Sequence, residues 1–286
     1  MKEIFMVLAA LFIIIFLITT CIFLYETIGG KVLSLGEWIL TRFVKLNPIQ
    51  IHILEFNFRY YQRLSPENKL KFQRRVKFFL LNKRFYPQGG MNITEEMKIM
   101  IGACFVQLTF GLRPVKLRHF SRFYIYPTRY FSKITNLQHV GEVQTDGAIV
   151  LSWQHFQKGY EIPDDGLNVG LHEMAHAIKL ADMFDDDDDF EGNSLFDYKD
   201  LVRFFKIGKS EINEIKKDKT HFIRKYAATN IEELFAVSIE YFFEKPEEFR
   251  IEVPQLYQIL VQLLKQDPTN SNSVEFRENK KNESTN

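Results

Sequence analysis

The chain has 286 residues, of which 46% are hydrophobic, and a formal net charge of +1. Such a chain can bury one large core once an apolar N-terminal segment is set aside. The near-neutral charge argues against a dedicated nucleic-acid binder, because phosphate contacts need a basic surface. The two cysteines, Cys21 and Cys104, imply no disulfide framework.

An apolar run without charged side chains fills residues 4–25, behind a short flank at residues 1–3. Its length is close to the roughly 20 residues that a helix needs to span a bilayer. A cleaved secretory signal is the alternative, but the run exceeds the usual apolar stretch of about 7–15 residues and no small-residue cleavage site follows. We therefore expect a single-pass transmembrane helix. Basic residues are more numerous after the run than before it, which predicts that the rest of the chain is cytoplasmic.

Three further segments follow the predicted span. Residues 26–48 form a connector, which is either an amphipathic segment on the membrane surface or an ordinary helix. Residues 49–268 are predicted to form the main domain. Residues 269–286 are polar without apolar periodicity and are predicted to be a disordered tail.

The main domain is predicted to be a mainly helical α+β fold. Helical spacing of apolar residues fills 49–85, with a new helix starting at Pro66, and a further helix occupies 94–110. Residues 123–127 and 147–153 are rich in aromatic and β-branched side chains, which predicts strands of a small sheet.

Residues 172–176 have the pattern H-E-x-x-H, with His172, Glu173 and His176. On a helix, residues four apart leave on the same side, so both imidazoles can bind one metal ion. Glu173 can take a proton from a water molecule on that metal. The pattern is typical of zinc peptidases, in which zinc lowers the pKa of water from about 15.7 toward 7.

A five-residue motif also occurs by chance, so its surroundings matter. Leu171, Ala175 and Ile178 fall at i, i+4 and i+7 and form one apolar stripe, which leaves the histidines on another side of the helix. Asn168 suits the start of that helix. The acidic run at residues 185–189 lacks the spacing and the glycine of an EF-hand calcium loop, and we interpret it as a solvated loop.

A catalytic zinc usually has three protein ligands, and no third histidine follows His176 at the metzincin spacing. The segment 226–243 offers carboxylates instead. Its apolar residues form an inward face, and a neighbouring stripe that includes Glu233 could reach the histidines. Asn230 or Thr229 is a natural N-cap here, and a glutamate three residues later can complete a capping box, but we expect Thr229 and Glu232 to fill that role and to leave Glu233 free.

Several separated blocks resemble the Mlc titration factor A family of bacterial zinc peptidases, between about residues 57 and 268. The blocks are residues 125–127, 150–153, 168–176, 226–229, 233–237, 240–243 and 266–268. The family is similar in its catalytic core to the gluzincins. The resemblance implies a zincin-like metallopeptidase domain with one Zn²⁺ per chain, held by His172, His176 and Glu233. It also implies Glu173 as the general base and Tyr226 as the donor to the oxyanion.

These roles agree with the chemistry of the side chains. A phenol donates a hydrogen bond to an oxyanion without competing for zinc, although a packing role for Tyr226 is open. Glu240, two turns beyond Glu233, could accept a hydrogen bond from a ligating imidazole. We expect the sheet edge that binds an extended peptide at residues 152–154, which are Ser152, Trp153 and Gln154.

The sequence thus predicts a membrane-anchored zinc peptidase that acts on a peptide or protein substrate. The resemblance implies an aminopeptidase activity and a transcription-regulator partner, the repressor Mlc. The alternative is a regulatory protein that binds such a partner, with a zinc that is structural. The complete catalytic set, with Glu173 and Tyr226, favours the enzyme.

Overall fold

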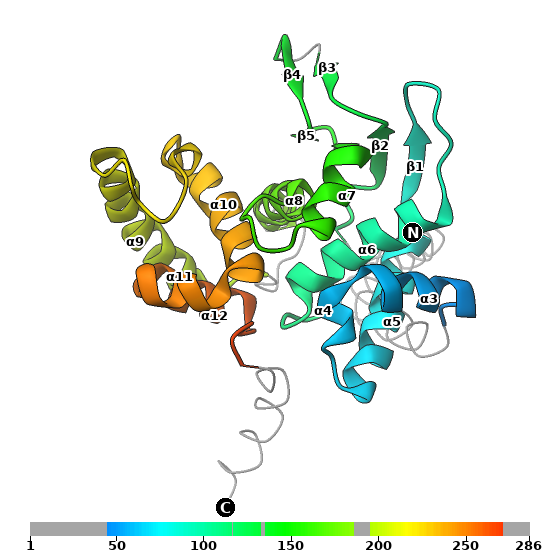
Figure 1. Cartoon of the computed structure of the whole chain (residues 1–286), viewed down its shortest axis with the longest axis horizontal. Helices are drawn as coiled ribbons and strands as arrows, with labels where there is room; N and C mark the ends of the chain where they lie inside the picture. Colours follow the sequence, from blue (N-terminus) through cyan, green and yellow to red (C-terminus); the bar gives the residue numbers. More distant parts are fainter. Residues whose placement is uncertain (1–44, 116, 133–134, 186–194, 271–286) are drawn as a thin grey trace, which may run out of the picture. The chain divides into compact units, whose positions relative to one another are not determined.

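The computed structural model describes residues 45–115, 117–132, 135–185 and 195–270, and all described helices and strands belong to the unit that begins at Leu46 (Figure 1). The first helices are α3 (Pro48–Asn57), α4 (Arg59–Gln62), α5 (Pro66–Leu81) and α6 (Glu95–Thr109). The predicted helix start at Pro66 is confirmed, because the Ser65 hydroxyl accepts a hydrogen bond from the Asn68 amide at 3.3 Å. Thr94 caps α6 in the same way, at 3.2 Å from the Met97 amide.

A four-stranded sheet has the order β1-β2-β6-β5. Its strands are β1 (Arg84–Pro87), β2 (Arg122–Tyr126), β6 (Ala148–Ser152) and β5 (Gly141–Gln144). The first three are parallel, whereas β5 is antiparallel to β6 and forms the outer strand. The hairpin of β3 (Tyr130–Ser132) and β4 (Leu137–His139) is a separate sheet, which extends away from the other strands in Figure 1. The two predicted strands are confirmed as β2 and β6.

The predicted peptide-binding edge is wrong. Ser152 ends β6, which lies between β2 and β5, and Trp153 and Gln154 begin helix α7 (Trp153–Glu161). All five residues of β6 are buried, so its largely aliphatic composition reflects a strand covered on both faces. The free edge on this side of the sheet belongs to the more polar β5.

The second half of the domain is helical. Its elements are α8 (Val169–Asp185), α9 (Tyr198–Lys217), the 3₁₀ helix η2 (Lys225–Ala228), α10 (Ile231–Glu244), α11 (Pro246–Glu252) and α12 (Pro254–Leu264). Helix α8 carries the H-E-x-x-H motif and packs against both α6 and α10. The fold is therefore the mainly helical α+β arrangement with a small sheet that the sequence predicts.

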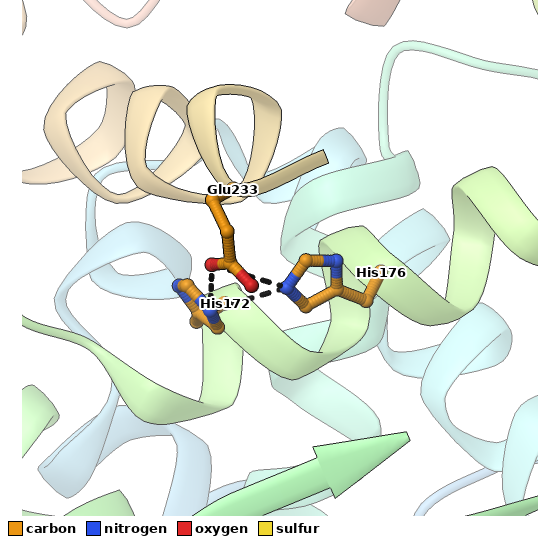
Figure 2. A group of neighbouring side chains, drawn as sticks. All are labelled: His172, His176 and Glu233. Atoms are coloured by element: carbon orange, nitrogen blue, oxygen red, sulfur yellow. Dashed lines mark hydrogen bonds and ion pairs between the residues drawn. The ribbon is translucent and has the colours of Figure 1, made fainter. Parts of the chain in front are cut away.

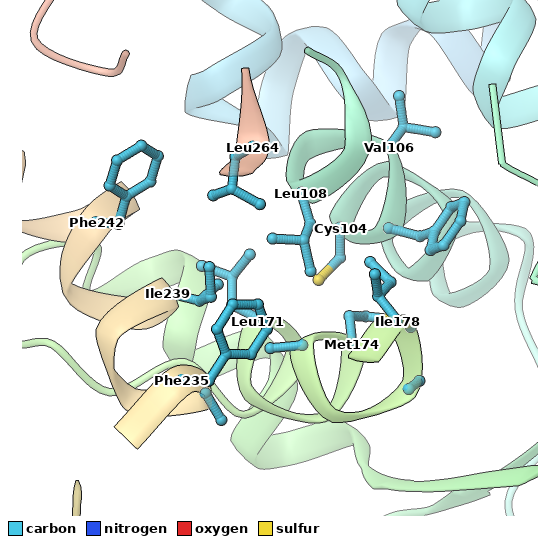
Figure 3. Close-up of a cluster of buried hydrophobic side chains, with 14 of the residues drawn as sticks. Cys104, Val106, Leu108, Leu171, Met174, Ile178, Phe235, Ile239, Phe242 and Leu264 are labelled. Carbon is cyan, nitrogen blue, oxygen red and sulfur yellow. The ribbon is translucent and has the colours of Figure 1, made fainter. Parts of the chain in front are cut away.

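Side chains of four helices meet in the core beneath the motif (Figure 3). The labelled side chains come from α6 (Cys104, Val106, Leu108), α8 (Leu171, Met174, Ile178), α10 (Phe235, Ile239, Phe242) and α12 (Leu264). The predicted apolar stripe of α8 is confirmed, since Leu171, Ala175 and Ile178 are all buried. Burying this stripe fixes the rotation of α8 about its axis, and the two histidines consequently emerge on the side that faces α10.

The predicted membrane span at residues 4–25 lies outside the described residues, as do most of the connector and most of the polar tail. Within the part of the chain that the structure describes, no helix is long and apolar enough to cross a bilayer. The prediction of a single-pass membrane protein therefore finds no support in the described part of the chain, and the membrane location is not part of the function that we propose.

Arg75 secures the C-terminal end of the central helix α6. Its guanidinium donates to the carbonyls of Thr109, Phe110 and Leu112 at 2.9–3.1 Å. We expect Arg75→Met to lower the free energy of unfolding by about 2–4 kcal/mol, because carbonyls that lose a charged donor cost about 1–3 kcal/mol each when buried. Urea unfolding measures the effect. Arg203→Met, at an exposed arginine of α9, is the control, and equal midpoints for the two variants would contradict the prediction.

Candidate metal centre

The start of α8 is held by one asparagine. The Asn168 side chain accepts from the Leu171 amide and donates to the Gly159 carbonyl, both at 3.0 Å. The backbone N–H of Asn168 donates to Glu240 Oε2 at 2.6 Å, and this hydrogen bond joins the start of α8 to α10. The prediction that Asn168 starts this helix is confirmed, and its cap fixes where the motif begins.

The start of α10 differs from the prediction. Asn230 is the N-cap, because its side chain accepts from the Glu233 amide at 2.8 Å. Thr229 instead donates its hydroxyl to the Tyr226 carbonyl, and Glu232 forms an ion pair with Lys179 at 2.9 Å. The predicted Thr229–Glu232 capping box is therefore wrong. Asparagine is as good a cap as threonine, and its use shifts the helix start by one residue. The Glu233 side chain takes no part in the cap.

Glu233 reaches between the two histidines of α8, as Figure 2 shows. Its Oε2 atom lies 3.2 Å from His172 Nε2 and 3.7 Å from His176 Nε2. The two Nε2 atoms are 3.2 Å apart, and one ligand atom from each residue lies within 4.8 Å of the others. Two imidazole nitrogens and one carboxylate oxygen thus converge on one point, as in a catalytic zinc site.

The protonation of His172 follows from its other nitrogen. His172 Nδ1 lies 2.8 Å from Glu240 Oε1, a contact that the sequence predicts. A carboxylate accepts hydrogen bonds, so Nδ1 carries the proton, and in the neutral ring Nε2 presents a lone pair toward Glu233. Glu233 Oε2 is buried and has no hydrogen-bond donor within the described residues. Lone pairs that converge on one point need a positive charge between them, either a proton or a metal ion, and two imidazoles with one carboxylate are a donor set that fits a metal ion.

The electrostatics of the cluster point the same way. Burial disfavours the charged imidazole, but the carboxylates of Glu233 and Glu240 outweigh it and raise the pKa of His172 to about 10. Burial also opposes ionisation of Glu233, yet its contacts with the two histidines lower the pKa of this carboxyl well below its usual range. The site therefore favours positive charge, which a proton supplies when no metal is bound.

Glu173 lies in a notch made by the outer strand. A Cβ atom at Gly141 of β5 would lie 2.4 Å from Glu173 Oε1 and 2.5 Å from its Cγ, so only glycine leaves room for this carboxylate. Glu173 is buried, and burial, opposed in part by the two histidines, raises its pKa to about 6. A carboxyl group of this pKa can exchange a proton near neutral pH.

Tyr226 and Arg224 both come from the segment around η2. Tyr226 is half exposed, and its ring centroid lies 6.1 Å from that of His172. Burial, followed by the charge of Glu233, raises the pKa of Tyr226 to about 12, so the phenol keeps its proton and remains a donor. Arg224 Nη2 lies 2.5 Å from Glu240 Oε1, and Nη1 donates to the Gly166 carbonyl. Arg224 thereby connects the tyrosine segment to the carboxylate that orients His172.

The model of the family described as glucose-regulated metallo-peptidase M90 matches residues 38–265, most of the chain. The chain belongs to this family. Membership of M90 agrees with the H-E-x-x-H motif and the three converging ligand atoms, and it confirms the resemblance to the Mlc titration factor A family.

Individual relatives of this M90 chain match over shorter stretches. An uncharacterized protein of Synechocystis sp. is 28% identical over 137 residues, which are 43% of this chain and 49% of that protein. Proteins named Mlc titration factor A from Yersinia pestis and Yersinia pseudotuberculosis are 30% identical over 131 residues, 41% of this chain and 48% of each relative. The chain thus spans about half the length of the curated relatives that it matches.

Two residues of the site escaped the sequence analysis. Gly141 has no sequence signal, because its importance lies in its contact with Glu173 from a different element. Arg224 had a weak signal, since it lies two residues before Tyr226 and a buried acid such as Glu240 needs a charged partner. Helical spacing predicts which residues share one side of α8 or of α10, but it contains no information on contacts between different elements.

Gly141→Ala tests the notch around Glu173. The added methyl group would displace the carboxylate, and a displacement of about 1 Å can lower the turnover of a peptide substrate by about 100-fold. Metal affinity should stay unchanged, because Gly141 touches no ligand in the set of His172, His176 and Glu233. Gly102→Ala, where the new Cβ would meet Val76 at 3.3 Å, is the matched control in α6.

A second-site change makes the test of Gly141 specific. Shortening the carboxylate with Glu173→Asp should be less harmful in the Gly141→Ala background than in the natural chain, because the shorter side chain makes room for the methyl group. Steady-state kinetics of the four proteins measure this coupling. Full activity of Gly141→Ala alone would show that the notch does not position the base.

Arg224→Gln tests the connection through Glu240. We expect Zn²⁺ affinity to fall by about 10-fold or more, because residues that orient a ligating histidine contribute about 10–100-fold to metal affinity. Competition with a chromophoric chelator measures it. Arg250→Gln, which breaks an exposed ion pair with Glu247 in α11, should leave the affinity unchanged. Equal affinities for both variants would assign Arg224 to folding alone.

Proposed function

We propose that this chain is a zinc-dependent peptidase in which His172, His176 and Glu233 hold the metal ion. The observation that carries the proposal is the convergence of their three ligand atoms within 4.8 Å, beside a buried carboxylate that is not part of the ligand set. A site for structural zinc is typically closed by four protein ligands, whereas three ligands leave a position for water or substrate. The donor set of two imidazoles and one carboxylate is also the one that zinc prefers in peptidases.

Bound zinc supplies Lewis acidity, which polarises a carbonyl group and lowers the pKa of water toward neutrality. Glu173 accepts the proton of the attacking water and later gives it to the leaving amine, for which its pKa of about 6 is well matched. Tyr226 donates a hydrogen bond to the oxygen that becomes negative in the transition state. Glu240 keeps the Nδ1 proton of His172 in place, so that Nε2 stays available to the metal.

We place the substrate backbone along β5. This strand is the outer member of the sheet, and its Gly141 touches Glu173, so a peptide that pairs with the free edge would pass the general base. The hydroxyl of Tyr130, buried without a hydrogen-bond partner among the described residues, lies in the same region, and its charge interacts with that of Glu173.

An aminopeptidase preference, implied by the family resemblance, predicts faster cleavage of peptides with a free N-terminus than of their acetylated forms.

The name of the Yersinia relatives, Mlc titration factor A, favours a second function. In that function the chain binds a transcription regulator such as Mlc, and the metal centre stabilises the binding surface. The two functions differ in what they require of Glu173. Hydrolysis needs its carboxylate as a base, whereas binding through another surface does not.

Glu173→Gln and His176→Ala separate these functions. Glu173→Gln should retain one zinc ion per chain and lose peptide hydrolysis by about 100-fold or more, because general-base catalysis contributes about 10²–10⁴-fold. His176→Ala should lose both zinc and hydrolysis, because it removes a ligand. Metal content is measured by atomic absorption and hydrolysis with a fluorogenic peptide library. Undiminished hydrolysis by Glu173→Gln would refute the catalytic role, and a zinc-loaded natural chain that binds Mlc but cleaves no peptide would favour the regulator.

A further inference from the structure

A cavity lies away from the metal centre. Its volume is about 450 Å³, and its walls come from α3, α5, the connection between α5 and β1, β1 itself, the loop after β1 and the first turn of α6. None of its lining residues belongs to α8, η2 or α10, which carry the metal-centre residues. Cavities of about 300–1,000 Å³ are the usual size for small-molecule sites in proteins.

Three of the lining residues are lysines, and we name the site the lysine cavity after Lys77, Lys83 and Lys98. Among the described residues that line the cavity, Glu95 is the single carboxylate, and it accepts from Gln50 at 2.6 Å and lies 3.5 Å from Lys98 Nζ. Glu95 therefore offsets about one of the positive charges that the lysines supply. The wall of the cavity keeps a net positive charge at neutral pH.

Lys83 is the unusual member of this set. Only 8% of the residue is exposed, and its ammonium group donates to the Leu117 carbonyl at 2.7 Å and lies 4.9 Å from the centre of the Phe79 ring. Lysines are among the residues least often buried, because an ammonium ion loses its hydration. Burial lowers the pKa of Lys83 to about 7, so a nearby anion would favour its charged form.

The remaining wall of the lysine cavity is apolar and includes Leu80, Phe85, Pro87 and Ile93. Phe85 and Pro87 are alternate residues of β1, the outer strand at the other end of the sheet from β5. A cavity with an apolar wall and a few convergent polar groups is typical of a binding site for a small molecule. The lysines match an anionic group, and the apolar residues match a compact hydrocarbon body.

We propose that the lysine cavity binds a small organic anion, in which a carboxylate or phosphate group is attracted by the lysines of the wall, with Lys77 as its main partner, and an aliphatic or aromatic body packs against Leu80 and Phe85. This site is separate from the metal centre and does not depend on the proposed peptidase activity. Helix α6 contributes Glu95 and Lys98 to the cavity and packs against α8 farther along its length, so an occupant would contact the same helix that supports the motif.

The test uses three probes of similar shape and the full chain. Isothermal titration calorimetry with 3-phenylpropionate, phenyl phosphate and the uncharged 3-phenylpropanol compares a carboxylate, a phosphate and no charge on the same aromatic body. At least one anion should bind at least about tenfold more tightly than the alcohol, which corresponds to about 1.4 kcal/mol. The anion that binds more tightly identifies the head group.

Variants locate the bound probe. Lys77→Gln and Lys83→Met should each weaken anion binding by about tenfold or more, because each removes one positive charge. Lys206→Gln, at an exposed lysine of α9, should leave binding unchanged. Carboxylates and phosphates also bind zinc, so His176→Ala serves as a second control and should bind the anion as the natural chain does.

Several results would overturn the proposal. The proposal is wrong if neither anion binds at about 100-fold excess over the protein, or if the alcohol binds as tightly as the anions. It is also wrong if Lys77→Gln and Lys206→Gln bind the anion equally well, or if His176→Ala no longer binds it. Should Lys83→Met fail to fold, the half-buried Lys77 still decides the outcome, because its substitution leaves the buried Lys83 in place.

Discussion

The metal centre is governed by the need to balance charge at a partly buried interface between two helices. Glu173, Glu233 and Glu240 lie close to the same two histidines, and Glu240 is almost fully buried. Buried carboxylates are tolerated only when cations or donors compensate them. Arg224 compensates Glu240 from one side, and a proton or a metal ion between the histidines and Glu233 completes the balance. The arrangement of α8 and α10 is therefore tied to the presence of positive charge between them.

Two asparagine caps place the ligands with little freedom. Asn168 starts α8 four residues before His172, and Asn230 starts α10 three residues before Glu233. The capped first turns hold the ligating residues in place, because these residues lie close to the helix starts. The buried stripe of α8 fixes the rotation of this helix about its axis. The Asn168 amide also binds Glu240, so the cap of one helix is joined to the side of the other. Short-range capping thus supports a site whose parts are distant in the chain.

The near-neutral charge of the chain conceals a separation of charge within the domain. Carboxylates gather at the metal centre, whereas three lysines line the lysine cavity, to which α6 contributes while it also packs against α8. A peptidase of the M90 family with an anion site beside its central helix would have two surfaces of different chemistry.

The sequence alone determined the features that depend on spacing within one helix. A period of 3.6 residues predicts that the two histidines lie on one side of α8 and that its apolar residues form a buried stripe. The same period predicts that Glu233 and Glu240 lie on one stripe of α10. Sequence reasoning failed where similar signals compete: Thr229 and Asn230 are both good caps, and β6 has the composition of a strand without revealing that β5 lies outside it. Only the tertiary structure decided that Gly141 leaves room for Glu173, that Arg224 reaches Glu240, and that three lysines share one cavity. Such contacts join separate elements, and no local periodicity encodes the distance between them.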